Sequence, residues 1–304
     1  MNKISTFKGL NNVTDPLRLG LSWLAQADNV DITATGAIKK RAGYSKAFTG
    51  AITDAYSTLD FSRLFVVDGG TLKAMTGPAS AVSLLTGLSP APMHWTEVND
   101  QVFFNNGIDS GIIQPDNEIL PWRGSHLADI EFLNAAGEGV DPLFDPLPVG
   151  ADVIQHWRGR IYAAHYMSVE GQSAVWFSQP LGYHLFSLDS DFILVPGRVR
   201  MLAPHDSALL IGTEGRIYAY NGERLDQLAP YGVVPGQHWD RDDGRVLFWS
   251  LRGLCAALPF VNLTEKQISV SPGLSAGGAL VHDGGRKRYL ISLSQGGQAF
   301  NSLN

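Results

Sequence analysis

Cysteine, long apolar runs and positive charge are all scarce in this chain of 304 residues. Its one cysteine, Cys255, excludes an internal disulfide, which fits folding in a reducing compartment. No window reaches the 18 or so apolar residues of a membrane span, and the first residues lack the apolar stretch of a secretory signal. We therefore expect a chain that is made in a cytoplasm and has no membrane partner.

An excess of acidic residues gives a formal net charge of −6 and a pI near 5.7. A general nucleic-acid binder needs excess lysine and arginine to displace counterions from phosphates. The composition therefore excludes sequence-independent DNA or RNA binding as the main activity. The 33 glycines and 16 prolines instead suit a fold with many turns.

The stretch from Ala208 to Gly222 predicts two short strands joined by a tight turn. Leucine, isoleucine and tyrosine favour a pleated, half-buried surface, and they dominate residues 208–212 and 216–220. Gly215 in the connection tolerates the positive φ that such a turn needs. Residues 216–220 alternate between two faces, so we expect one face to be buried and the other half-exposed.

Five further stretches repeat this pattern of strand, glycine turn and strand. The units begin near residues 63, 101, 160, 208, 245 and 286, and these steps of roughly 40 to 60 residues are near the blade period of β-propellers. We predict an all-β fold, a β-propeller of about six blades of short antiparallel strands. The alternative all-β architecture is a sandwich or two stacked sheets. Three hairpins, at 63–75, 101–113 and 208–220, should lie in separate sheets of one ring.

Residues 1–50 differ from the rest because they have turn signals and few alternating runs. We predict two parts, an irregular N-terminal arm with the strand that leads into the first blade (1–50) and the propeller domain (51–304). Residues 21–27 favour one or two helical turns. Lys39, Lys40 and Arg41 should lead into the first blade strand, and the Pro- and Gly-rich residues 135–148 should form an insertion or inter-blade crossing.

Signals for catalysis or metal binding are weak. The eight histidines are scattered without the spacing of a zinc site, and no Gly-x-Ser-x-Gly elbow is present. Cys255 lies in an apolar stretch typical of an inert core residue. Aspartates at 189 and 191, and at 240, 242 and 243, are more typical of solvated turns than of a glycosidase pair or a calcium site. We expect no enzyme activity, no catalytic residue, no cofactor and no metal ion.

Several short segments carry a resemblance to one family. They are Phe7–Asn12, Asp15–Leu19, Ala27–Asp31 and Gly36–Tyr44 at the start, then Ala174–Pro180, Leu209–Thr213 and Phe248–Gly253. The sequence resembles virion proteins of tailed bacteriophages, of the tail nozzle, tail hub or DNA-stabilisation type. In that group a similar glycine-containing start is followed by a propeller. This chain is shorter than typical nozzle proteins, which carry extra tip domains.

The resemblance implies a structural component of a virion that is assembled in the bacterial host cytoplasm. Such a protein would form a homo-oligomeric ring, contact other tail, head-tail adaptor, portal-proximal or fibre proteins, and let DNA pass through an exit channel without reading its sequence. An acidic surface suits this role because carboxylates repel phosphates. The alternatives are a propeller that binds or cleaves glycans and an intracellular scaffold propeller.

Apolar side chains in the arm suggest that it is an attachment element rather than a free tail. A disordered segment would have few such residues. The expected apolar anchors are Phe7, Leu10, Val13, Leu17, Leu19, Leu21, Trp23 and Leu24. The expected assembly contacts are Phe7, Leu10, Arg18, Trp23, Lys39, Lys40 and Arg41.

Overall fold

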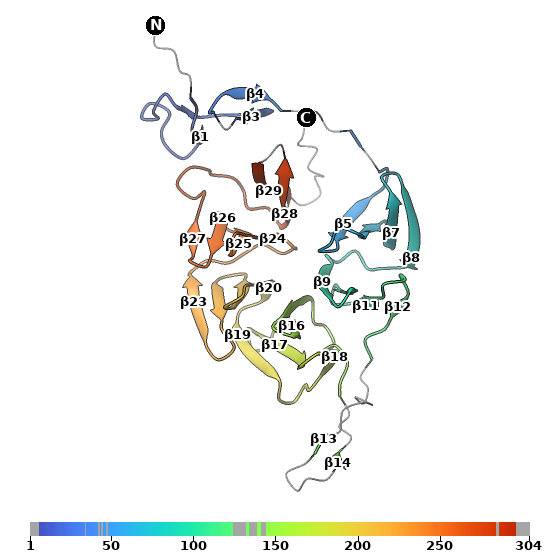
Figure 1. Cartoon of the computed structure of the whole chain (residues 1–304). Coiled ribbons are helices and arrows are strands. Elements are labelled where there is room, and N and C mark those ends of the chain that lie inside the picture. The colour runs from blue at the N-terminus through green and yellow to red at the C-terminus, as the bar shows by residue number, and fades with distance from the viewer. Residues whose placement is uncertain are drawn as a thin grey trace. The chain divides into compact units, whose positions relative to one another are not determined.

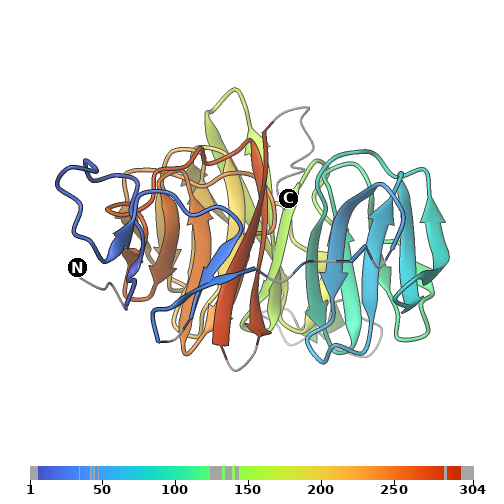
Figure 2. The same cartoon turned by 90° about the horizontal axis from the view of Figure 1, so that it is seen from above.

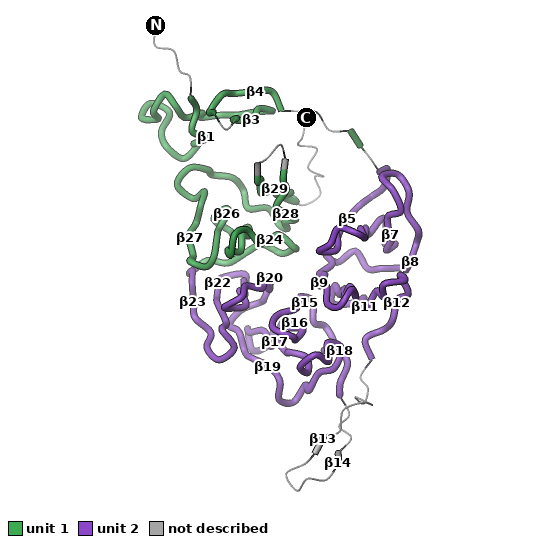
Figure 3. Tube along the Cα trace, viewed as in Figure 1, with its two compact units in different colours: residues 1–46, 231–304 green, residues 47–230 purple. Residues whose placement is uncertain are grey.

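The computed structural model describes residues 6–123 except 34, 42, 44 and 47, residues 132–133 and 139–140, and residues 144–283 and 286–295. The described chain is all-β, with strands and turns and no helix, so no helix that could span a membrane occurs in it (Figure 1). Two compact units are present (Figure 3). Unit 1 comprises residues 1–46 and 231–304, and unit 2 comprises residues 47–230.

Unit 2 contains four antiparallel sheets that follow one another along the chain. The first sheet comprises β5 (Ile52–Ser57), β6 (Leu64–Asp68), β7 (Thr71–Gly77) and β8 (Ser80–Thr86), and the second comprises β9 (His94–Val98), β10 (Gln101–Asn105), β11 (Ser110–Ile113) and β12 (Ile119–Leu120). The third comprises β15 (Val153–Trp157), β16 (Arg160–Met167), β17 (Gln172–Gln179), β18 (Gly182–Phe186) and β19 (Phe192–Pro196). The fourth comprises β20 (Val199–Pro204), β21 (Leu209–Thr213), β22 (Ile217–Tyr220) and β23 (Leu225–Ala229). A two-stranded sheet, β13 (Phe132–Leu133) and β14 (Gly139–Val140), lies between the second and third. Half of the predicted insertion at 135–148, residues 135–138 and 141–143, falls outside the described residues.

Unit 1 contains one four-stranded sheet and three two-stranded sheets. The four-stranded sheet comprises β24 (Trp239–Asp242), β25 (Arg245–Ser250), β26 (Gly253–Ala257) and β27 (Val261–Asn262), and it is followed by the hairpin β28 (Ser275–Asp283) and β29 (Arg286–Ser294). The arm supplies the other two pairs, parallel β1 (Gly9–Leu10) with β2 (Trp23–Leu24) and antiparallel β3 (Val30–Ile32) with β4 (Ile38–Lys40).

The five sheets of four or five strands are the blades of a β-propeller. This confirms the predicted fold class. The sixth predicted unit differs from the other five, because within the described residues it is the two-stranded hairpin β28–β29. Within unit 2, the first strand of the third blade, β15, lies beside the first strands of the second and fourth blades, β9 and β20 (Figure 3). Figure 2 shows the blades of this unit from above. The third blade therefore contacts both of its neighbours in unit 2 through its first strand as well as through its apolar side chains.

The three hairpins singled out in the sequence are antiparallel and lie in separate sheets, as predicted. They are β6–β7, β10–β11 and β21–β22. The β6–β7 turn has positive φ at both Gly69 (57°) and Gly70 (74°), which is type I′ geometry.

The turn after β21 forms for a different reason from the one expected. Gly215 does not have a positive φ; instead the Thr213 hydroxyl accepts hydrogen bonds from the backbone N–H of Gly215 (3.3 Å) and Arg216 (3.0 Å). The Thr213 N–H also donates to the Arg216 carbonyl (2.8 Å). Threonine is therefore the residue that closes this turn.

Within unit 2 the central strands are largely buried, and Tyr218 and Tyr220 of β22 pack against the third blade. All four residues of β22, Ile217 to Tyr220, are buried, whereas a half-exposed strand was expected. Each boundary between consecutive blades of unit 2 holds one apolar cluster, which is centred on Trp95 and Phe104, on Phe103 and Phe186, or on Trp157 and Tyr218. Burial of such side chains contributes about 1.5–3 kcal/mol each.

A polar joint also links the second and third blades. The buried Thr96 hydroxyl of β9 accepts hydrogen bonds from the Gln155 side chain (3.1 Å) and the His156 backbone N–H (2.9 Å) of β15. Buried polar groups need hydrogen-bond partners, so these contacts fix the register of β9 relative to β15 as well as the spacing between the two strands.

Candidate functional site

The arm, residues 6–46, is held against the rest of unit 1 by polar contacts. The Asn12 side chain donates to the Ser269 carbonyl (2.9 Å) and accepts from the Ser269 N–H (2.7 Å), and the Asn12 N–H donates to the Gln267 carbonyl (3.0 Å). Arg288 lies 3.3 Å from Asp31 in an ion pair. The arm therefore has defined partners within the chain.

Asp31 is the electrostatic centre of this attachment, because Arg41 (3.4 Å) and Arg288 (3.3 Å) both pair with it. Partial desolvation raises the pKa of Asp31, but the two guanidinium groups outweigh it and hold that pKa below its ordinary value. The carboxylate stays ionised at neutral pH and joins β3 to β29.

The apolar side chains of the arm are only partly covered within one chain. None of the eight expected anchors is fully buried: Phe7, Leu10, Leu19, Trp23 and Leu24 are half-buried, and Val13, Leu17 and Leu21 are exposed. The expected helical turns at 21–27 are wrong, since Trp23–Leu24 is the strand β2, whose pairing with β1 replaces intrahelical hydrogen bonds.

The basic residues of the arm lie in two places. Lys39 and Lys40 are exposed in β4, which pairs with β3, so they do not lead directly into the first blade strand, β5. The turn at residues 33–37 positions β4, since the Thr33 hydroxyl accepts from the Ala37 N–H (3.0 Å). Arg18 is exposed in the loop between β1 and β2.

That loop, residues 13–21 and hereafter the arm loop, is ordered by its own hydrogen bonds. Buried Asn11 accepts at Oδ1 from the N–H groups of Val13 (3.2 Å) and Thr14 (3.0 Å). Asp15 accepts at Oδ1 from the Leu17 N–H (2.9 Å). These Asx-type turns fix the backbone without an apolar core, and so Leu17 and Leu21 are exposed to solvent.

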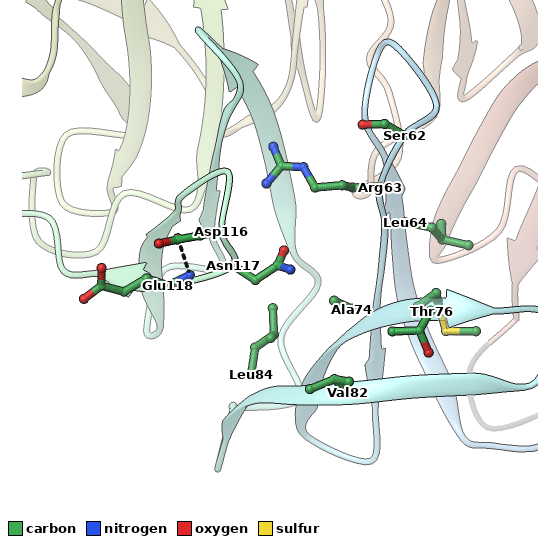
Figure 4. A pocket seen from close by; sticks show the side chains of 11 residues that line it. Ser62, Arg63, Leu64, Ala74, Thr76, Val82, Leu84, Asp116, Asn117 and Glu118 are labelled. Carbon is green, nitrogen blue, oxygen red and sulfur yellow. Dashed lines mark hydrogen bonds between the residues drawn. The ribbon is translucent and has the colours of Figure 1, made fainter.

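A pocket of about 460 Å³ lies in unit 2 between the first blade and the β11–β12 turn (Figure 4). Strands β6–β8 supply its apolar wall, which includes Leu64, Val82 and Leu84, and the turn supplies Asp116, Asn117 and Glu118. Asn117 reaches into the space from the turn, and its buried Oδ1 has no hydrogen-bond partner among the described residues. Hereafter this is the inter-blade pocket.

Arg63 closes one side of the inter-blade pocket and is already committed to structure. Its guanidinium donates to the Gln114 carbonyl (2.8 Å) and to the Asp100 carbonyl, and it stacks over the Phe65 ring at 5.5 Å. Arg63 thus ties the first blade to the second, while Asp116 and Glu118 at the opposite wall form no ion pair within the described residues.

The aspartate clusters and the cysteine have structural partners. Asp242 and Asp243 both pair with Lys287, and Asp240 accepts from the Leu280 N–H (2.7 Å). Asp240 and Asp242 lie in β24 rather than in a solvated turn. Cys255 is fully buried, and burial raises the pKa of its thiol. Among the described residues, no group of three or more His, Cys, Asp or Glu side chains is placed to hold a metal ion.

Comparisons with known proteins match the fold. No family model matches the chain, and no curated protein matches its sequence. Among solved structures, the extracellular domain of BT4673 from B. thetaiotaomicron is 13% identical over 76% of this chain and 30% of its own length, with a TM-score of 0.46. The WD40 propeller domain of Doa1 is 13% identical over 68% of this chain and 65% of its own, with a TM-score of 0.42. Streptogramin B lyase is 10% identical over 81% and 94%, with a TM-score of 0.43. The chain thus spans about 30% of the length of the BT4673 extracellular domain in each of its two matched structures, and none of these likenesses carries an argument about activity.

Proposed function

We propose that this chain is a structural subunit of a tailed-bacteriophage virion, of the tail nozzle, tail hub or head-tail type, that forms part of the DNA exit channel. The observation that carries the proposal is the N-terminal sequence, residues 7–44, which resembles the start of that group and which folds here as an arm outside the blades. Attachment through a segment distinct from the blades leaves the propeller intact in each subunit.

Two physical features support the same role. Propeller blades leave only short protected edges, so many copies can be packed close together without edge-to-edge aggregation. The net charge of −6 keeps phosphates from adhering to the protein while DNA moves past it. Neither feature requires a catalytic centre. The arm and the inter-blade pocket are both suited to contacts between proteins.

Electron microscopy of the purified chain, and of phage particles labelled with an antibody against it, tests this proposal. We expect rings with a central opening and label at the tail or the head-tail junction. A strictly monomeric protein that binds or cleaves glycans, with no label on particles, would contradict the proposal.

Deletion of residues 1–25 gives a second test of the arm. It removes β1, β2 and the contacts of Asn12 but no blade strand, so the circular dichroism spectrum should remain that of a folded β protein. Incorporation into particles should fall strongly. If the truncated chain is incorporated at the normal level, the arm is not the attachment element.

A further inference from the structure

We propose that the arm loop of one copy docks in the inter-blade pocket of a second copy, so that the subunits join head to tail. This inference rests on the proposed function, in which copies of the chain assemble into a ring, and it names the surfaces that meet. A contact between two different surfaces of identical subunits closes into a ring or continues as a filament.

Apolar complementarity is the first argument. Leu17 is 95% exposed and Leu21 is 70% exposed, although the loop that carries them is held by defined hydrogen bonds. Leucines that are held on an ordered loop can be covered by a partner with a small loss of conformational entropy. The inter-blade pocket offers a matching wall, in which Val82 is 54% exposed and Leu84 and Leu64 lie beside it.

Charge complementarity is the second argument, and it identifies the arm loop as the segment that binds in the inter-blade pocket. Arg18 is exposed next to Leu17 and forms no ion pair within the described residues. The pocket turn carries two exposed carboxylates, Asp116 and Glu118, and neither forms an ion pair within the described residues. A guanidinium donates several hydrogen bonds in a planar fork, so one arginine can bind a carboxylate through two of them. The arm loop supplies that arginine between its leucines.

Sedimentation velocity over a range of protein concentrations tests the contact by charge reversal. Arg18→Glu and Glu118→Arg should each weaken self-association by about 10-fold, because each places like charges opposite each other. The double variant restores opposite charges and should recover most of the association. If the double variant associates no better than either single variant, Arg18 and Glu118 do not meet.

The apolar part of the contact has a closely matched control. Leu17→Ser should weaken self-association by about 10-fold to 100-fold, which corresponds to the loss of one buried leucine. Val169, in the turn after β16, is 94% exposed and lies outside both surfaces, so Val169→Ser should leave association unchanged. Equal effects of the two variants would overturn the proposal.

Cross-linking shows whether the contact is between copies. Cys255 is buried, so introduced cysteines are the accessible thiols. Chains with Leu17→Cys are mixed with chains that carry Val82→Cys and are then oxidised gently. We expect a disulfide-linked pair of the two chains, and much less of it when Val169→Cys replaces Leu17→Cys.

The outcomes separate this inference from the proposed function. Rings that form normally in the Arg18, Leu17 and Glu118 variants would refute the docking of arm loop into pocket and leave a structural ring protein standing. A wild-type chain that stays monomeric at every concentration and gives no cross-link would refute the docking and remove the support for a ring as well.

Discussion

Replacement of His238 should remove a measurable part of the pH dependence of stability. His238 is fully buried in unit 1. Its Nε2–H donates to the Val234 carbonyl (2.9 Å), and its Nδ1 accepts from the Trp249 N–H (3.1 Å). Protonation of Nδ1 would destroy the second hydrogen bond and leave a charge without solvent. Desolvation accordingly lowers the pKa of His238 from 6.5 to about 4.

The direction and the size of this pH effect follow from the linkage between proton binding and folding. Because the folded-state pKa lies below the unfolded value, stability is complete above pH 6.5 and is lost as the pH falls toward about 4. The unfolded chain takes up the proton first. Between pH 7 and pH 5, His238 should therefore lower the free energy of unfolding by about 2 kcal/mol.

Urea denaturation at pH 7 and pH 5, followed by tryptophan fluorescence and circular dichroism together, measures this effect. In His238→Gln the chain is less stable at pH 7, but the change between the two pH values should differ from that of the wild type by about 2 kcal/mol. Subtracting the pH response of the variant from that of the wild type cancels the contributions of other titrating groups. These groups include His156 and His184, whose pKa values are lowered by burial. Exposed His282→Gln is the control and should behave as the wild type. An unchanged pH response in His238→Gln would refute the reasoning.

Three further perturbations have distinct expected results. Phe104→Ala removes a fully buried ring that packs at 5.9 Å from Trp95 and should cost about 3–5 kcal/mol in urea denaturation, whereas exposed Phe61→Ala should cost little; equal costs would refute the inter-blade core. Burial raises the pKa of Asp54 from 3.8 to about 7, so its contribution to stability is complete below pH 3.8 and is lost as the pH rises through 7. Asp54→Asn should therefore make the free energy of unfolding depend less on pH between pH 5 and pH 8. An unchanged slope of that free energy against pH would contradict this. Asn12→Ala removes the side-chain hydrogen bonds that dock the arm and should speed limited proteolysis of residues 13–25, unlike Lys8→Ala at an exposed site; equal cleavage rates would show that Asn12 does not hold the arm.

The hairpins were predictable because their signals are local. Gly69 and Gly70 permit the positive φ values of a tight turn, and the flanking apolar runs mark the two strands. The first and last strands of a blade, such as β5 and β8, carry weaker patterns, because all of their residues are exposed or half-buried. The full burial of β22 was missed because part of it comes from packing against the third blade, which the local sequence does not show.

The candidate site was only partly visible in the sequence. Arg18, Lys39 and Lys40 stood out as exposed cations, and the structure places them on the surface of the arm. The inter-blade pocket gave no signal, because its walls come from residues 62–84 and 116–118 and meet only through packing of two blades. The arm was expected to dock by apolar contacts, whereas Asn12 and Asp31 provide hydrogen bonds and ion pairs that composition does not distinguish from ordinary surface residues.

The pairing of Asn12 with Ser269 spans 257 residues, and that separation sets the timing of events during synthesis. At about 5–20 residues per second, a ribosome needs roughly 13–50 s to make the chain between the two partners. The blades of unit 2 can close in that interval, while the arm has nothing to dock against until the last part of the chain emerges. Arg288, the other partner of the arm, is made later still. A nascent chain would therefore keep its arm undocked until residues 267–288 have left the ribosome.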